Sequence, residues 1–319
     1  MKRSLAAGLF GLAFAAAFAA RPAAPQATPV FGVGLEMIHV TVTARDAKGR
    51  LVSDLGAGDF AVREDGRPQK IQVFAPAAQP AEREEREELA LNLGMLFDTS
   101  ESMRREIKLS QESAIRFLDA IPRAKDLLLV FFDRDIRISR YSSENQQGIF
   151  ERILGTEGSG YTALNDAIAI YLSRVADTPG RKVLVLFSDG DDTTSRINGG
   201  DVTALLRASD VVVYPVAFAG ERPNSPEGLR AQAFLASLAV DSGGQVFKPH
   251  ASKELAAIYQ SILEELGSQY VLGYVSGNTV RDGKFRRLTV EVRRPGVKLR
   301  HRPGYDAPRD EPPAARKKH

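Results

Sequence analysis

The sequence predicts an α/β protein in which a doubly wound, mostly parallel sheet is inserted between two β segments. Four continuous apolar runs of strand length recur in the middle of the chain, and such runs are typical of strands buried on both faces. The runs are Leu91–Phe97, Leu127–Phe132, Val183–Phe187 and Val211–Phe218. Helical patterns separate these runs, and residues alternate between apolar and polar near both ends of the chain.

The N-terminus has the three parts of a secretory signal. Met1-Lys2-Arg3 is basic, Leu5–Phe18 is apolar, and small residues precede Arg21-Pro22. The apolar run is shorter than the roughly 20 residues of a membrane-spanning helix. We therefore expect residues 1–20 to be a cleaved signal peptide and the mature protein to be secreted or periplasmic, without a transmembrane segment. Residues 21–30 are rich in Ala and Pro and are expected to form a flexible leader.

The composition excludes several classes of protein. Hydrophobic residues make up 43% of the 319, which is enough for a sizeable core and argues against global disorder. The chain has no cysteine, so it has neither a disulfide framework nor a lipid-modified N-terminal cysteine. Removing Lys2 and Arg3 with the signal leaves 41 of the 43 Lys and Arg residues against 40 Asp and Glu. This balance gives no reason to expect a nucleic-acid partner.

Residues 31–78 are expected to form an N-terminal β segment. Glu36–Ala44 alternates between apolar and polar residues, which is typical of a half-buried strand. Asp65-Gly66 lies between two alternating runs and predicts a hairpin. Residues 79–88 follow with five Glu and two Arg, and this composition indicates a solvated linker.

Residues 89–266 are expected to form the α/β domain. Each of its helical patterns presents apolar residues on one face. The expected helices are Ile107–Ile121, Thr162–Ala176, Val202–Ala208, Gly228–Val240 and Lys253–Leu266. Strand and helix therefore alternate in the way that a doubly wound sheet requires.

Residues 267–306 return to a strand pattern, which is clearest in the alternation of Leu288–Arg293. A few strands are rarely stable alone, so we expect this C-terminal β segment to pair with residues 31–78 in one small sandwich. Two independent β appendages are the alternative. Residues 307–319 are Pro-rich and charged and are expected to be a disordered tail.

Three polar clusters fall where a predicted strand ends or a predicted helix begins. Asp98, Ser100 and Ser102 follow the first apolar run. Thr162 lies at the start of a predicted helix, and Asp189 follows the third run. Ligands of open α/β sheets bind beyond the carboxyl ends of the strands, and oxygen ligands suit Mg²⁺, Mn²⁺ or Ca²⁺ better than zinc. Each cluster alone is also explained by helix capping or a turn, but their combination favours a metal site.

These five residues resemble the metal-ion-dependent adhesion site of von Willebrand factor type A domains, which include integrin I domains. That motif is D-x-S-x-S after the first strand, a Thr in a Gly-containing loop, and an Asp after the fourth strand. The resemblance covers about residues 89–266. It implies that Ser100, Ser102 and Thr162 bind Mg²⁺ directly, with Mn²⁺ or Ca²⁺ as alternatives, and that Asp98 and Asp189 bind directly or through water. An open position on the cation would then accept a carboxylate from an Asp or Glu of a partner protein.

The segments on either side of this domain are similar to those of a subfamily of exported bacterial proteins. The similarity rests on Gly58-Asp59-Phe60, followed by Glu64-Asp65-Gly66, and on Arg302-Pro303-Gly304-Tyr305. It implies export, but it implies no activity.

Two further groups of charged residues are explained by exposure to solvent, but each also has a functional interpretation. Glu101, Asp191 and Asp192 lie next to the motif, where they would form a second cation site or tune the first. Arg281–Arg302 contains nine Lys and Arg against two acidic residues. It is interpreted as a solvated strand face, with a surface for anionic lipid or polysaccharide as the alternative.

We therefore predict a secreted, non-enzymatic module that binds a partner carboxylate through a divalent cation. A metal-independent structural protein of the cell envelope is the first alternative. A metal-dependent hydrolase is the second, and it is disfavoured because the motif segments contain no His, Lys or Cys to serve as base or nucleophile. The sequence also has neither a nucleophile elbow nor a P-loop.

Overall fold

The structure is a computed structural model, and it describes six segments of the chain. The segments are residues 37–76, 91–120, 126–141, 146–220, 222–249 and 251–309. The predicted signal peptide (1–20), leader (21–30) and linker (79–88) lie outside the described residues, as do residues 310–319 of the predicted tail. All described residues belong to one compact unit, residues 36–319.

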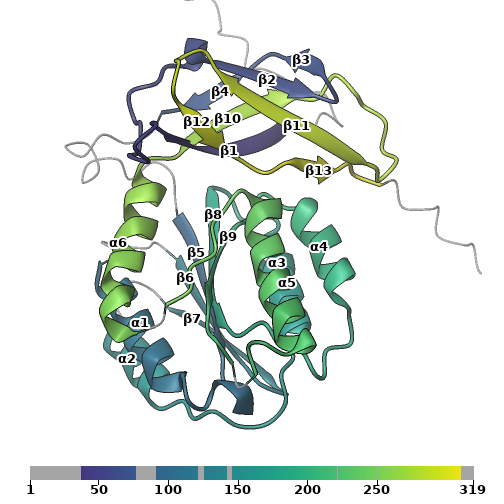
Figure 1. Cartoon of the computed structure of the whole chain (residues 1–319). Helices are drawn as coiled ribbons and strands as arrows, with labels where there is room; N and C mark the ends of the chain where they lie inside the picture. Colours follow the sequence, from purple (N-terminus) through teal and green to yellow (C-terminus); the bar gives the residue numbers. More distant parts are fainter. Residues whose placement is uncertain are drawn as a thin grey trace, which may run out of the picture. The chain divides into compact units, whose positions relative to one another are not determined.

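A five-stranded sheet forms the centre of the α/β part, with the strand order β7-β6-β5-β8-β9 (Figure 1). The strands are β5 (Leu91–Asp98), β6 (Asp126–Phe132), β7 (Ile136–Tyr141), β8 (Arg181–Ser188) and β9 (Val212–Ala217). Four of them run parallel, and β7 runs antiparallel to its neighbour β6. Strands β8 and β9 are buried along almost their whole length, which explains their continuous apolar sequences.

Helices cover both faces of this sheet. On one face, Phe117, Ile153 and Tyr259 pack against the sheet from α1, α2 and α6, and α3, α4 and α5 cover the other face (Figure 1). The helices are α1 (Ile107–Ala120), α2 (Gln146–Leu154), α3 (Leu164–Val175), α4 (Gly199–Arg207), α5 (Pro226–Ser242) and α6 (Ser252–Gly267). None of the helices in the described segments is long and apolar enough to cross a membrane.

Two four-stranded antiparallel sheets combine strands from both ends of the chain, in the orders β12-β1-β10-β4 and β13-β11-β2-β3. The N-terminal strands are β1 (Met37–Arg45), β2 (Phe60–Glu64), β3 (Arg67–Gln69) and β4 (Val73–Ala75). The C-terminal strands are β10 (Tyr270–Val275), β11 (Phe285–Val292), β12 (Lys298–Arg300) and β13 (Gly304–Asp306). Strand β1 pairs with β10, strand β2 pairs with β11, and one hydrophobic core lies between the sheets. The predicted fold class is confirmed.

The predicted hairpin is also confirmed. Glu64 of β2 pairs with Arg67 of β3, and the two residues between them have positive φ angles, 47° at Asp65 and 79° at Gly66. Two residues in this conformation match the right-handed twist of a hairpin, and Asp-Gly is a favoured sequence for such a turn. The chain then leaves this sheet, because β4 pairs with β10 in the other one.

A buried polar cluster lies inside the sandwich around Glu64, whose side chain is 2% exposed. The hydroxyl groups of Ser276, Tyr274 and Tyr305 donate to its carboxylate at 2.6, 2.7 and 2.9 Å. The guanidinium of Arg286 lies 3.5 Å away. Burial by itself raises the pKa of Glu64, but these three donors and the Arg286 charge together hold it below its ordinary value.

A second buried cluster, the Glu265 cluster, connects the end of α6 to the sandwich. The Glu265 carboxylate is 1% exposed and accepts a hydrogen bond from the Tyr214 hydroxyl of β9 at 2.6 Å. It also forms ion pairs with Arg45 of β1, at 3.1 Å, and with Arg300 of β12. One carboxylate therefore joins a helix of the α/β part to strands from both β segments.

The sequence prediction omits β7 and α2. Strand β7 is an edge strand whose residues 136–140 are half-buried or exposed, and of these five residues Ile136 and Ile138 are apolar. Helix α2 has nine residues, and two of them, Ile149 and Ile153, are buried. Both elements are too short and too little buried for their periodicity to stand out from the flanking turns.

Candidate functional site

Asp98 is the last residue of β5 and is completely buried. The hydroxyl and the backbone N–H of Ser100 donate to its Oδ1 at 2.5 and 3.0 Å. The hydroxyl of Ser188 donates to its Oδ2 at 2.6 Å. Both carboxylate oxygens therefore have hydrogen-bond donors, which fix the plane of the Asp98 side chain.

The backbone after Asp98 turns alternate side chains in opposite directions. Ser100 is extended at the start of a short 3₁₀ turn, Glu101–Met103, and the Oγ atoms of Ser100 and Ser102 lie 3.0 Å apart. Glu101 between them is 60% exposed and pairs with Arg104 at 3.0 Å. The two serine hydroxyls of the motif thus face one another, while the intervening carboxylate faces solvent.

Asp189 follows β8 directly and is 7% exposed. Its Oδ1 accepts the Asp191 backbone N–H at 3.1 Å, and the Ser102 hydroxyl also bonds to its carboxylate. Burial raises the pKa of Asp189. Burial, followed by the nearby Asp189 charge, raises the pKa of Asp98 to about 7. Two carboxyl groups are thus held together away from water, an arrangement that a cation would stabilise.

Thr162 is 2% exposed and precedes α3. Its N–H donates to the Thr193 hydroxyl at 2.9 Å, and its carbonyl accepts the N–H groups of Thr193 and Thr194 at 2.9 and 3.0 Å. In the same loop the Gly160 carbonyl accepts the Glu101 N–H at 3.1 Å. The Thr162 loop is therefore bonded on one side to the loop after β5 and on the other to the loop after β8.

The five predicted ligands thus lie on three loops that are bonded to one another beyond the carboxyl ends of β5 and β8. Asp98, Ser100, Ser102 and Asp189 are linked through their side chains, and Thr162 lies on the loop between them in the chain. The set is entirely oxygen, with three hydroxyls and two carboxyls, and it fits a hard divalent cation. In the described segments, no cluster of three or more His, Cys, Asp or Glu has the arrangement of a metal site.

The three residues predicted as a possible second site have other contacts. Asp192 accepts the Asn165 N–H at 3.1 Å, in the first turn of α3, and the Ser195 N–H at 3.1 Å. Asp191 is exposed and accepts the N–H of its neighbour Asp192 at 3.1 Å. Glu101 pairs with Arg104, as described above. These contacts give Asp192 the position of a helix cap for α3.

Two features around the site are absent from the predicted residues. Ser188 is not among the predicted ligands, although the strand register that pairs Phe97 with Phe187 brings it next to Asp98. Asp133 is also not among the predicted residues, and it accepts hydrogen bonds from the Arg137 guanidinium at 2.8 Å and the Thr99 hydroxyl at 3.3 Å. No local pattern in the sequence identifies Ser188, because its contact with Asp98 depends on the register of two strands and joins residues that are 90 positions apart.

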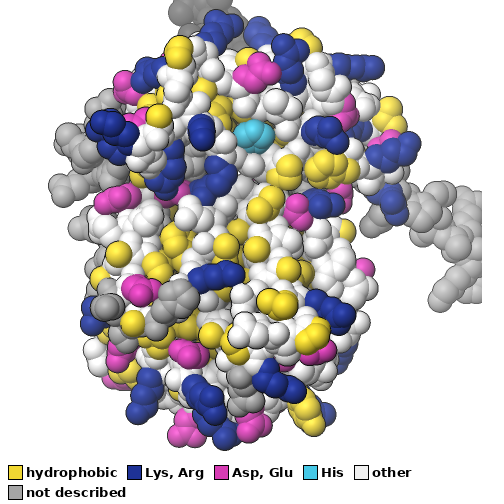
Figure 2. All heavy atoms as spheres, in the orientation of Figure 1, with side chains coloured by type: hydrophobic (Ala, Val, Ile, Leu, Met, Phe, Trp, Pro, Cys, Tyr) yellow, Lys and Arg dark blue, Asp and Glu magenta, His cyan; other side chains and the backbone are white. Residues whose placement is uncertain are grey.

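The basic stretch Arg281–Arg302 only partly forms the expected solvated face. Arg286 and Arg302 are buried, and Arg300 takes part in the Glu265 cluster. On the face seen in Figure 2, Lys and Arg side chains are interspersed with acidic and apolar ones. The positive charge of this stretch is therefore used partly inside the protein.

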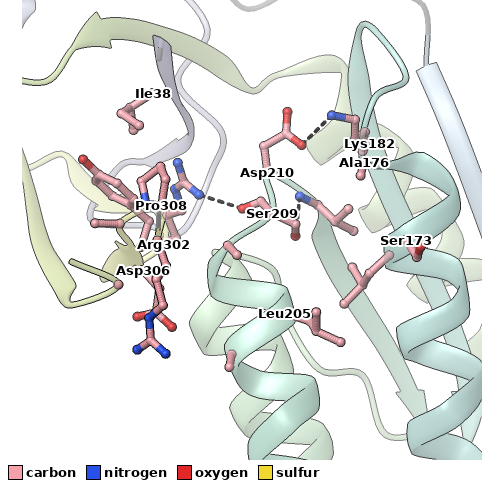
Figure 3. Close-up of a pocket in the computed structure, with 18 of the residues that line it drawn as sticks. Ile38, Ser173, Ala176, Lys182, Leu205, Ser209, Asp210, Arg302, Asp306 and Pro308 are labelled. Carbon is pink, nitrogen blue, oxygen red and sulfur yellow. Dashed lines mark hydrogen bonds and ion pairs between the residues drawn. The ribbon is translucent and has the colours of Figure 1, made fainter. Parts of the chain in front are cut away.

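Described residues line two hollows of different size. A small one of about 90 Å³ adjoins the candidate cation site and is lined by Ser102, Asp189, Gly220 and Arg222. A larger groove of about 990 Å³ is lined by Leu172 of α3 and Leu205 of α4. Figure 3 shows Leu205 in this lining. Two polar contacts lie in the lining of this groove (Figure 3). Lys182 forms an ion pair with Asp210 at 2.7 Å, and Arg302 donates a hydrogen bond to the Ser209 carbonyl at 2.8 Å.

Comparison with known proteins gives one family and several solved structures. Residues 94–191 match the family model of the von Willebrand factor type A domain. No curated protein matches the chain.

The similar solved structures have low sequence identity. An aerotolerance-related membrane protein from Bacteroides fragilis is 13% identical, with a TM-score of 0.46 over 55% of this chain and 98% of that one. A von Willebrand factor type A protein from Catenulispora acidiphila is 13% identical, with a TM-score of 0.45 over 79% of this chain and 74% of that one. The pilus adhesin SpaC from Lactobacillus rhamnosus GG, in its open conformation, is 9% identical, with a TM-score of 0.47 over 80% of this chain and 48% of that one. Since the family match spans β5, α1 to α3 and β8, the central segment of this chain, residues 94–191, is similar to a von Willebrand factor type A domain.

Proposed function

We propose that this protein is a secreted, non-enzymatic interaction module that binds partner proteins through a divalent cation. The observation that carries the proposal is the hydrogen-bonded group of Asp98, Ser100, Ser102 and Asp189, in which two buried carboxyl groups and two hydroxyls converge. The family match of residues 94–191 supports an interaction module. The predicted signal peptide supports a location outside the cytoplasm.

The ligand set indicates what a bound cation would do. The hydroxyls of Ser100, Ser102 and Thr162 are neutral, so a cation held by them would keep much of its positive charge. Mg²⁺ prefers six oxygen ligands and retains waters, which leaves a position for an oxygen of a partner's Asp or Glu. We therefore assign Ser100, Ser102 and Thr162 as direct ligands, and Asp98 and Asp189 as carboxylates that bind the cation directly or through water.

The first experiment is titration calorimetry with Mg²⁺ and Mn²⁺ on the wild type and on Asp98→Ala and Asp189→Ala. We expect one saturable site in the wild type and its loss in both variants, with unchanged far-ultraviolet circular dichroism. Asp177→Ala is the matched control, because Asp177 is an exposed aspartate at the other end of α3. If the wild type binds neither cation, the metal-independent envelope protein becomes the better account.

The second experiment tests the partner chemistry with a random peptide display library. The protein is immobilised, the library is bound in Mg²⁺, and bound clones are eluted with EDTA. We expect the eluted peptides to be enriched in Asp or Glu and to be lost when Asp98→Ala is used instead. Binders that resist EDTA and have no acidic enrichment would contradict recognition through a cation.

A further inference from the structure

We propose that Ser188, which is outside the five-residue motif, is a positioning residue of the cation site. This inference rests on the proposed function and deepens it. Ser188 would touch neither the cation nor the partner. It acts through Asp98 and through the loop that carries Asp189.

The direction of the hydrogen bonds at Ser188 is fixed. Its hydroxyl is completely buried, lies 2.6 Å from Asp98 Oδ2, and is 2.9 Å from the backbone nitrogen of Gly190. The Gly190 N–H can only donate, so the Ser188 oxygen accepts from it. The single hydroxyl proton is then directed to Asp98. Ser188 therefore presents a donor to the Asp98 carboxylate in every arrangement that keeps both contacts.

This hydroxyl connects the two strands that supply the carboxyl groups. Ser188 ends β8, Asp98 ends the neighbouring strand β5, and Asp189 is the next residue after Ser188. Through Gly190 the same oxygen fixes the turn that follows Asp189. The turn packs closely against α5, because a Cβ at Gly190, where φ is +86°, would lie 2.6 Å from the Ala231 carbonyl of that helix.

Ser188 also holds one of the two oxygens of the Asp98 carboxylate in place. Oδ1 is bonded to Ser100, a predicted direct ligand, and Oδ2 is bonded to Ser188. Without the Ser188 hydroxyl, the carboxylate is held from one side only and can rotate about its Cβ–Cγ bond. Residues that orient metal ligands from behind typically change metal affinity by about 10- to 100-fold when they are mutated.

The test is calorimetry of the full chain with Mn²⁺ alone, on the wild type, Ser188→Ala, Ser188→Thr and Ser110→Ala. We expect Ser188→Ala to weaken Mn²⁺ binding by about 10- to 100-fold with one site retained. Ser188→Thr keeps a hydroxyl donor and is expected to stay close to the wild type. Ser110→Ala is the control: this serine of α1 is also buried, and its hydroxyl has no hydrogen-bond partner among the described residues.

A second readout separates positioning from a purely structural role. Mg²⁺ demands near-octahedral geometry, whereas Ca²⁺ accepts flexible coordination. Loosening Asp98 should therefore weaken Mg²⁺ binding more than Ca²⁺ binding. Loss of folding stability alone would change neither the affinity nor this preference in the folded fraction.

The outcomes are distinct. If Ser188→Ala binds Mn²⁺ and Mg²⁺ like the wild type, this inference is overturned and the proposed function stands. If the wild type binds no cation, both are overturned. If Ser188→Ala does not fold, Ser188→Cys decides, because it keeps the size but supplies only a weak donor; its affinity should fall between those of Ser188→Thr and a complete loss.

Discussion

Glu265→Ala should destabilise the protein more than any change at its exposed neighbours. Glu265 is the shared acceptor of Arg45, Arg300 and Tyr214, and its side chain is 1% exposed. Alanine removes the Glu265 carboxylate, which supplies the negative charge in the cluster of Glu265, Arg45, Arg300 and Tyr214. It leaves two guanidinium groups without their anion and the Tyr214 hydroxyl without its acceptor.

The magnitude follows from the exposure of the partners. Removing one member of a buried ion pair costs about 3–5 kcal/mol. The side chains of Arg45 and Arg300 are 32% and 29% exposed, so water can partly solvate them once Glu265 is gone. We therefore expect a loss at the lower end, about 3 kcal/mol. At about 2–4 °C for each kcal/mol in domains of 150–250 residues, the melting temperature should fall by roughly 6–12 °C.

The assay is thermal and urea unfolding followed by circular dichroism, with Glu264→Ala as the matched control. Glu264 is the preceding residue of α6, is exposed, and accepts a hydrogen bond from Gln260 at 2.9 Å. Its loss should change the unfolding free energy by no more than about 0.5 kcal/mol. Equal effects of the two substitutions would refute the view that the Glu265 cluster holds α6 to the sandwich.

Two further predictions concern single carboxylates. The folded-state pKa of Glu64 is below its ordinary value. The ionised Glu64 carboxylate therefore stabilises the fold at any pH above the unfolded-state pKa of about 4.3. This stabilisation is lost as the pH falls through the folded-state pKa. Glu64→Gln removes the nearer and more deeply buried anion of Arg286 and leaves only the longer contact to Asp282, at 3.9 Å. It should therefore cost about 3 kcal/mol at pH 7, and urea unfolding should show the difference shrinking below about pH 4. Asp192→Ala should lower the unfolding free energy by about 0.5–2 kcal/mol, because it removes the acceptor of the Asn165 N–H in the first turn of α3, and calorimetry should show unchanged Mg²⁺ affinity. A tenfold loss of affinity in Asp192→Ala would instead favour its role as a ligand.

The sequence was sufficient for the fold class because the strands of the central sheet differ strongly in pattern from the helices. The sequence was insufficient for features that depend on which residues pack against one another. Gly94 lies in the apolar run of β5, but a side chain there would lie 2.0 Å from the ring of Tyr171, and only the packed structure reveals this contact. The prediction that residues 267–306 pair with residues 31–78 is confirmed, but the choice of individual partners, such as β1 with β10, depends on contacts between residues more than 200 positions apart.

The residues of the candidate site also divide into those that the sequence identifies and those that it does not. Asp98, Ser100 and Ser102 are recognisable because their spacing is local. Ser188 and Thr193 are not, because their importance comes from Asp98 and Thr162, which are distant in the chain. A serine before Asp-Gly is also an ordinary turn residue, so its type carries no separate signal.

The most direct test of the cation site is a crystal structure of the protein soaked in Mn²⁺, with anomalous differences measured near the manganese edge. The proposed function predicts one peak about 2 Å from the hydroxyl oxygens of Ser100, Ser102 and Thr162. A peak that lies instead on Asp191 or Asp192, or the lack of any peak at these hydroxyls at saturating Mn²⁺, would contradict it.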